Sequence, residues 1–575
     1  MRLLSCALLT ALLAAVPAQA QQDTTGNADP ALPEIAPREV EIRGELDISL
    51  PALQRPAVSG LLPSSPLQPL PSAPLPEPAS LPEPAGAAPR TLPGEAEASS
   101  GFAALPPPRA GLLEAGAGRY LSRFARVRFD QPLASQWTLR PRLNYIGTDG
   151  FAPFDAKNVE TPADELRGAA TLRTERSAFT AALTADGFFA QHPLYGAVGA
   201  GGRDLAAQPN RDRYGGSAQL HVQAGGGTGA TLEARAHAKA AQVTTDASTG
   251  EGARFERRER RAGGSLSGGG PVGDVRLEAS ARGSAARFSG SFADRPSSSN
   301  ASFLDAGAGV QLRRSEGLRV FAGARALTFS SGGDSGLFFA PDVRLTWQAT
   351  PRVALYARTN PHAAANRLAA RYRENPSLLY EAAPQPNVFT LDAEGGLRFF
   401  TERALELRAF AGYRRAPSFL FYEDERARRY ERGVTAARYG EARIIRAGGA
   451  LSVRRGEQLS ASLSAAYRRG TLASSDAEIP YFSPLTVEAS ASYAFLGGDG
   501  HVRLTGTFES PRPLARGRDG EVGAFADLDV EGRYALTPTI SVVARLENIS
   551  AGALERFDRY PRPPLVVQSG LRLHL

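Results

Sequence analysis

The sequence predicts an all-β protein, a transmembrane antiparallel β-barrel of roughly 18–22 strands. Apolar and polar residues alternate along many segments of about ten residues, as in strands with one face in lipid and one in water. The chain is 42% hydrophobic, and beyond its first twenty residues it holds no run of about eighteen apolar residues, so a helical span is not expected. No repeat of fixed period indicates a soluble solenoid or propeller.

The alternation is clearest in the last ninety residues. Between residues 485 and 495 every second side chain is apolar, namely Leu485, Val487, Ala489, Ala491, Tyr493 and Phe495. The final segment places Leu571, Leu573 and Leu575 on one face and Arg572 and His574 on the other. Because a strand sends successive side chains to opposite faces, we expect the three leucines to belong to a lipid-facing C-terminal insertion strand.

Four regions are expected along the chain. Residues 1–20 form a secretory signal peptide, because a short apolar core follows Arg2 and precedes a small-residue cleavage site at Ala18-Gln19-Ala20. Residues 21–50 hold one short strand, and residues 51–115 are a proline-rich, extended linker. The barrel occupies residues 116–575. Export through the Sec pathway to the outer membrane of a Gram-negative-type bacterium follows from the signal peptide and the barrel together.

Strands and connections can be placed within the barrel. Strands are expected at Trp137–Tyr145, Leu232–Ala240, Val275–Arg282, Leu318–Arg325, Leu405–Tyr413, Leu459–Tyr467, Ala526–Leu536 and Ile540–Leu546. Short turns are expected at 497–500 and 536–539, and long loops at 150–167, 190–212 and 360–386. Outer-membrane barrels combine short periplasmic turns with long external loops, so the long loops are expected outside, where they choose the solute.

Candidate site residues follow from this placement. The lumen-facing candidates are charged residues on the polar faces of expected strands: Arg140, Arg142, Glu488, Arg503, Asp527, Asp529, Glu531 and Arg545. The external-loop candidates are Arg371, Tyr372, Arg373 and Tyr380, chosen because they are expected to be exposed in the 360–386 loop. The ladder Asp527, Asp529 and Glu531 is either a cation site or a wall paired with arginines such as Arg503 and Arg545, and the paired wall is favoured.

No enzymatic site is indicated. The six histidines include no pair at metal-ligand spacing, and the glycine-rich stretches lack the ending of a phosphate loop. The only cysteine, Cys6, lies within the signal peptide, which excludes disulfides from the mature chain. The net charge of +7 comes from arginines interleaved with acids, so nucleic-acid binding is not expected. We therefore expect no enzyme activity, no metal and no cofactor.

The end of the chain resembles the end of a TonB-dependent receptor. The resemblance rests on Leu546, Asn548 and Ile549 in one strand, on Phe557, Asp558 and Tyr560 in a connector, and on Gly570, Leu571, Arg572 and Leu573 in the last strand. It implies an outer-membrane uptake barrel. Three features depart from the family: too few residues precede the barrel for a standard plug, no clear TonB-contacting box is present, and Leu575 stands where an aromatic is usual.

Two functions remain open. The first is uptake or passage of an unidentified solute through the barrel. The alternative is an outer-membrane scaffold whose proline-rich arm binds a periplasmic or surface partner. Expected partners are outer-membrane lipid, the barrel-assembly machinery and, through residues 38–110, an inner-membrane energy-transducing or other periplasmic protein. A secreted β-sandwich or β-helix adhesin would not explain a single apolar face on each strand.

Overall fold

The computed structural model describes residues 111–575 with short gaps at 135, 154–160, 177–178, 200–208, 226–228, 247–253, 293–294, 314–316, 382, 402–404, 425–429, 457, 516–519, 551 and 553. The expected signal peptide, the strand within residues 21–50 and the linker up to residue 110 lie outside the described residues. The first described strand, β1, spans Gly111–Gly118. The barrel therefore begins five residues before the expected boundary at residue 116.

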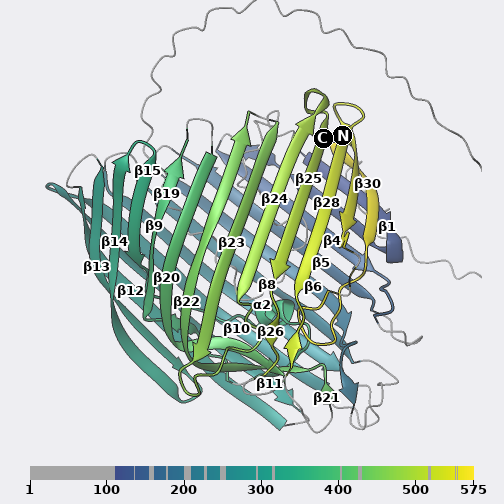
Figure 1. Cartoon of the computed structure of the whole chain (residues 1–575), viewed down its shortest axis with the longest axis horizontal. Coiled ribbons are helices and arrows are strands. Elements are labelled where there is room, and N and C mark those ends of the chain that lie inside the picture. Colours follow the sequence, from purple (N-terminus) through teal and green to yellow (C-terminus); the bar gives the residue numbers. More distant parts are fainter. Residues whose placement is uncertain are drawn as a thin grey trace, which may run out of the picture. The chain divides into compact units, whose positions relative to one another are not determined.

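Twenty-two antiparallel strands form a closed barrel (Figure 1), which is the upper end of the expected number. In order around the wall they are β1, β2 (Arg123–Phe129), β4 (Trp137–Thr148), β5 (Ala163–Glu175), β6 (Phe179–Pro193), β8 (Asn210–Ala224), β9 (Thr231–Asp246), β10 (Arg254–Val272), β11 (Val275–Phe292), β12 (Arg295–Arg313), β13 (Leu318–Ser331), β14 (Asp334–Thr350), β15 (Val353–Thr359), β19 (Leu391–Phe400), β20 (Leu405–Asp424), β22 (Thr435–Arg455), β23 (Leu459–Leu472), β24 (Leu485–Phe495), β25 (Gly500–Glu509), β28 (Phe525–Ala535), β29 (Ile540–Glu547) and β30 (Val566–His574).

The barrel closes where the first strand meets the last. β1 pairs with β30 in continuous register from Leu112 opposite His574 to Gly118 opposite Gln568. Glu114 lies at the centre of this seam and is completely buried. Its carboxylate pairs with Arg572 of β30 at 2.5 Å, with Arg126 of β2 at 3.3 Å, and with Arg545 of β29. One carboxylate thus connects strands from both ends of the barrel sequence.

The outward face is apolar, as the alternation predicts. Leu266, Leu304 and Leu571 are 53%, 49% and 54% exposed, while Asp305 and Arg572, which follow two of these leucines in sequence, form ion pairs on the opposite face. Leu575 is also exposed, which places the end of the chain on the outward face; its role in insertion stays a prediction. Among the described residues, no helix is long and apolar enough to cross a bilayer.

The two ends of the barrel differ in their connections (Figure 1). The end that holds Gly111 and Leu575 carries short turns such as 273–274, 351–352 and 536–539. The opposite end carries the long connections 149–162, 194–209, 360–390, 473–484, 510–524 and 548–565. The expected asymmetry is confirmed. Several strands are longer than the sequence suggested: β20, for example, runs from Leu405 to Asp424, well past the expected end at Tyr413.

Candidate functional site

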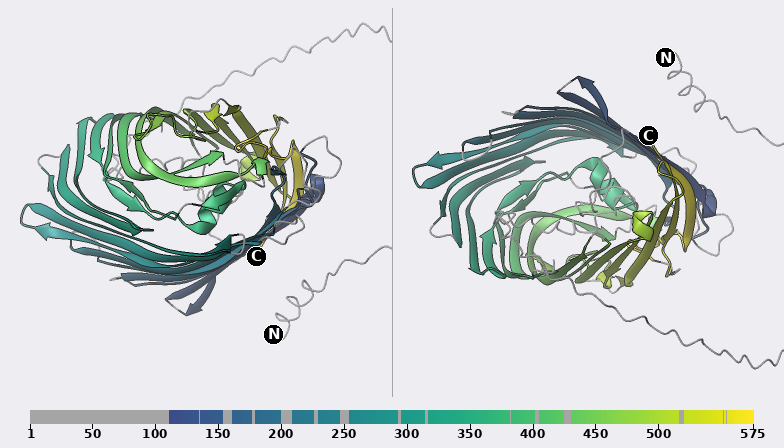
Figure 2. Two further views of the ribbon diagram at one scale, coloured as in Figure 1. Left: turned by 90° about the horizontal axis from the view of Figure 1, so that it is seen from below. Right: turned by 90° about the horizontal axis from the view of Figure 1, so that it is seen from above.

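The longest of these connections folds into the barrel. Residues 360–390, termed here the lumen segment, contain β16 (His362–Ala364), α2 (Leu368–Glu374), β17 (Leu378–Glu381) and β18 (Asn387–Phe389). Both end-on views in Figure 2 place α2 inside the ring of strands. The lumen segment therefore occupies space that an open pore would leave to water.

Buried charged groups attach the lumen segment to the wall formed by β8 and β10. Arg211 of β8 donates to the carbonyl oxygens of Pro376 at 2.7 Å and Leu378 at 2.5 Å, and its guanidinium lies 4.8 Å from the ring centre of Tyr372. Glu259 of β10 accepts from the backbone N–H of Leu368 at 2.6 Å. That N–H belongs to the first turn of α2, where backbone donors have no partner within the helix and a carboxylate is stabilising.

The lumen segment is also bonded to β20 and β22. β17 pairs in parallel with β22, and Asn375 donates to Thr435 Oγ1 at 2.7 Å. Glu374 accepts from the hydroxyl of Tyr422, on β20, at 3.2 Å. Because β8–β10 and β20–β22 lie apart in the strand order, the lumen segment joins separate parts of the wall and cannot leave the lumen without breaking contacts on both.

Side chains from several external connections pack over the lumen segment. We call this group the mouth cluster; its members from the loops include Leu194, Ala197, Leu368, Tyr372, Leu378, Leu379, Val434, Tyr481, Val522, Phe557 and Tyr560. Tyr195 donates to the carbonyl of Pro561 at 2.9 Å, which ties two loops that are far apart in sequence. Phe557 and Tyr560 of the family-like connector are both buried here. The mouth cluster narrows the external end of the barrel.

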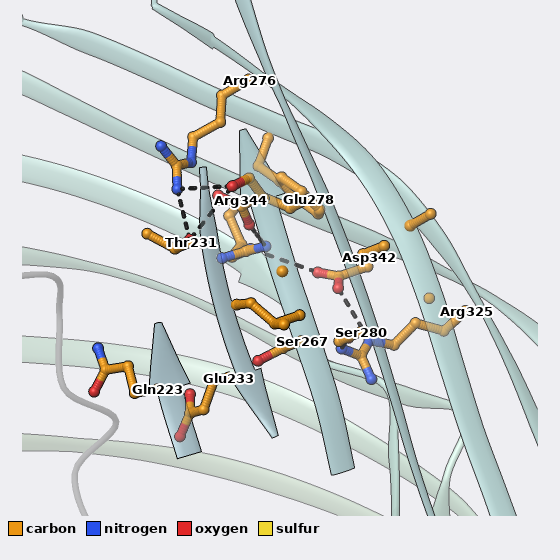
Figure 3. Close-up of a pocket in the computed structure, with 17 residues that line it drawn as sticks. Gln223, Thr231, Glu233, Ser267, Arg276, Glu278, Ser280, Arg325, Asp342 and Arg344 are labelled. Atoms are coloured by element: carbon orange, nitrogen blue, oxygen red, sulfur yellow. Dashed lines mark hydrogen bonds and ion pairs between the residues drawn. The ribbon is translucent and has the colours of Figure 1, made fainter. Parts of the chain in front are cut away.

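A polar cavity lies in the lumen wall (Figure 3). Its lining residues Gly269 and Arg276 flank the short turn at 273–274, so it lies toward the end with short turns. Its volume is about 410 Å³. Arg344 pairs with Glu278 at 3.0 Å, and Arg325 pairs with Asp342 at 3.1 Å and donates to Ser280 Oγ at 2.8 Å. Carboxylates and guanidinium groups therefore alternate around the cavity, which suits a polar, charged solute rather than an apolar one.

Asp305 of β12 connects this cavity to the lumen segment. It is completely buried and accepts from Arg325 and from Arg282, the latter at 2.8 Å. The backbone N–H of Ala363, in β16, donates at 3.3 Å to Asp305 Oδ2, the same oxygen that accepts from Arg282. A change in the pairing of Arg325, a cavity residue, would therefore reach the lumen segment through one side chain.

A second buried ion network lies on β19 and its neighbours. Asp392 pairs with Arg414 at 2.9 Å and with Arg446 at 2.7 Å. Glu394 pairs with Arg408 at 2.6 Å and with Arg358 at 3.0 Å, and also contacts Arg446. Four arginines thus share two carboxylates, so this part of the wall carries excess positive charge.

The structure brings several of the predicted lumen residues into ion pairs. Glu531 pairs with Arg545 at 3.2 Å, Arg140 with Asp130 at 3.2 Å, and Asp527 with Arg562. Asp529 accepts from the backbone N–H of Asn548 at 3.0 Å, and Arg503 donates to Ser492 Oγ at 3.4 Å. Arg142 and Glu488 lie on β4 and β24 at positions of the polar alternation. The carboxylate ladder is therefore held by guanidinium and backbone donors, and its part in solute passage stays a proposal.

The exposure expected of the external-loop candidates is corrected by the structure. Arg371 and Tyr372 are only 1% and 3% exposed, because α2 packs inside the barrel. Arg371 donates to the hydroxyl of Tyr439 at 3.1 Å and lies 3.4 Å from the carboxylate of Glu381. Arg373 is partly exposed, and Tyr380 lies in β17. All four lie in the lumen segment, and within it Arg371 and Tyr372 are buried rather than exposed.

Comparison with known proteins supports the architecture. No protein-family model and no curated protein sequence matches the chain. Similar solved structures include the FrpB iron transporter from Neisseria meningitidis (TM-score 0.63, 12% identity, covering 81% of each chain). They also include the copper transporter OprC (TM-score 0.60, 15% identity, 80% of each chain) and the siderophore receptor PirA from Acinetobacter baumannii (TM-score 0.60, 12% identity, 81% of this chain and 80% of that chain).

These likenesses show the fold. The chain is an outer-membrane β-barrel with the fold of the TonB-dependent receptors, as its closing motif suggested. The similar structures are transporters and receptors rather than enzymes. Residues 1–110, which precede the barrel, lie outside the described part of the chain, so the expected departures in the plug and the TonB-contacting box stay predictions.

Proposed function

We propose that the barrel carries a polar, charged solute across the outer membrane and that the lumen segment controls the path. The observation that supports this most directly is a wide barrel with a charged wall whose lumen is crossed by a bonded internal segment. A wall of alternating guanidinium and carboxylate groups offers a solute replacements for its hydration shell. The similar structures are named as carriers or receptors of iron, copper and siderophores, which supports a metal-bearing solute as the first class to examine.

Electrical conductance tests the proposal. We expect the purified protein to give small or no currents in planar bilayers, and a variant with residues 361–389 replaced by a short Gly-Ser linker to give large, stable currents. Shortening 510–524, which belongs to the mouth but not to the lumen segment, is the matched control and should leave the current near that of the wild type. The linker replacement and the shortened 510–524 connection should each also be measured in a chain that lacks residues 21–110, so that any effect of the N-terminal residues on the current is removed. Silence of every variant would refute passage through the lumen.

The pH dependence of conductance follows from Glu374. Burial raises the pKa of this α2 carboxyl to about 8, while the Tyr422 hydroxyl, Arg556 and Arg371 act in the opposite direction. Its ordinary pKa is 4.5, so the folded segment binds more protons than the released one between these values. The segment is then most stable below about pH 4.5, loses stability as pH rises through the interval to about 8, and changes little above it.

We therefore expect wild-type currents to increase between pH 5 and pH 9. Because Glu374 keeps some contact with solvent, we expect an effect of about 1–2 kcal/mol, or roughly tenfold in the population of the released segment. Glu374→Gln should abolish the increase, whereas Glu478→Gln, in an external loop, should retain it. An unchanged pH profile in Glu374→Gln would exclude this carboxyl as the titrating group.

The scaffold function is the second candidate. The packed mouth cluster favours it, because a barrel closed by apolar contacts can serve as an anchor. In that case the partner would bind residues 38–110, and pull-down with the full chain but not with a 21–110 deletion is expected. Partner capture together with zero conductance in all variants would favour the anchor over the carrier.

A further inference from the structure

The outward face of the barrel carries two arginines directly opposite each other. Arg260 of β10 and Arg287 of β11 are register partners, and both are exposed. Like charges directly opposite on neighbouring strands are destabilising. Among the residues that the structure describes, no carboxylate pairs with either guanidinium. By contrast, Arg258, two residues along the same face of β10, pairs with Glu256.

A groove of small side chains runs beside this arginine pair. Two residues farther from the long loops along each strand, at the next outward position, the register joins six small residues in a row across six strands: Ala218, Ala238, Ala262, Ala285, Ser302 and Ser330. These residues and the arginine pair line a shallow depression of about 950 Å³. Its lining is mainly apolar, because four of the six side chains in the row are single methyl groups.

The depression lies where the apolar band of the barrel ends. On β10, the outward positions farther from the long loops are Gly264 and Leu266, and those nearer to the long loops are Arg258 and Glu256. On β12, Leu304 lies farther from the long loops than the depression, whereas Asn300, the register partner of Arg287, lines it at the level of the arginine pair. The arginine pair therefore lies at the level of the headgroups in the external leaflet, and the row of small residues lies at the level where acyl chains begin.

We propose that this surface binds one anionic membrane lipid, with its phosphate between Arg260 and Arg287 and an acyl chain in the groove. A phosphate accepts charge-assisted hydrogen bonds from both guanidinium groups and removes their mutual repulsion. The groove has room for a chain because no branched side chain fills it. A free anion would use the arginines but would have no use for the groove, so the combination favours a lipid. This inference does not depend on solute passage.

Native mass spectrometry of the full-length protein in detergent tests the site. We expect the wild type to retain one bound phosphatidylglycerol. Diacylglycerol with the same acyl chains lacks the phosphate, and we expect it not to be retained at this site. The double variant Arg260→Gln, Arg287→Gln should lower the retained fraction at least fivefold. Arg258→Gln, whose arginine already has a carboxylate partner, is the matched control and should bind like the wild type. Equal binding by the double variant and the wild type would overturn the proposal.

A second variant separates a lipid from a free anion. Ala262→Phe fills the groove and leaves both arginines in place, so it should weaken phosphatidylglycerol retention to a similar extent. Inorganic phosphate should compete only weakly. Full retention by Ala262→Phe together with complete competition by inorganic phosphate would assign the arginines to a free anion and refute the lipid site. Heat-modifiable gel mobility, measured for each variant, verifies that the barrel is folded.

Discussion

Glu114→Ala is expected to lower the stability of the closed barrel by about 3–5 kcal/mol, the cost of leaving a buried ion cluster without its carboxylate. Glu114 is the acceptor shared by Arg126, Arg545 and Arg572. Without it, Glu531 remains as a carboxylate near Arg545, but it is partly exposed and cannot replace all three contacts. The guanidinium groups would then repel one another across the seam between β1 and β30.

The measurement is the temperature at which the protein changes from fast to slow mobility in a gel. We expect that temperature to fall by roughly 5 °C in Glu114→Ala. The fall is modest because, in a protein of this size, each kcal/mol of lost stability lowers the melting temperature only slightly. Glu488→Gln, an exposed carboxylate on β24, is the control and should change stability by no more than about 0.5 kcal/mol. If Glu114→Ala melts at the same temperature as the wild type, the backbone pairing of β1 with β30 closes the barrel without help from this ion cluster.

Arg211→Ala is expected to release the lumen segment. The substitution leaves the carbonyl oxygens of Pro376 and Leu378 without this donor in a buried site and removes the contact with the Tyr372 ring. Charge-assisted hydrogen bonds of this kind contribute about 1.5–3 kcal/mol each, so we expect the released population to rise on the order of a hundredfold or more. The barrel wall should remain intact, because β8 keeps its register with β6 and β9.

Limited trypsin digestion detects this release. In the wild type, Arg371 is buried and peptides ending at Arg371 or Arg373 should be scarce. In Arg211→Ala they should appear rapidly, while barrel mobility on gels is unchanged. The control is Arg235→Ala. Arg235 is a lumen arginine that pairs with Glu233 and is not among the residues described above as contacting the lumen segment. If digestion of Arg211→Ala follows the wild type, other contacts hold the segment.

The barrel and the asymmetry of its two ends were accessible from the sequence because they depend on local patterns. Alternation specifies which side chains face lipid, as Leu571 and Leu575 show, and turn composition specifies which end has short connections. The site was only partly accessible. Glu531 and Arg545 were expected to pair, but Glu114 lies within residues assigned to the linker, and nothing near it in sequence indicates three arginine partners. The exposure expected of Arg371 and Tyr372 was wrong, because a polar loop and an inward-folding segment have similar compositions.

By itself, the sequence determined a membrane protein built of strands with an apolar exterior, because adjacent residues of a strand face opposite sides and their alternation can be read directly from the sequence. Only the tertiary structure decided where buried charges meet. Arg211 reaches Leu378 across 167 positions and Arg572 reaches Glu114 across 458, and such contacts depend on strand order and register around a closed wall. Those distant contacts fix the lumen segment in place, whereas the apolar and polar faces of the wall follow from residues adjacent in sequence.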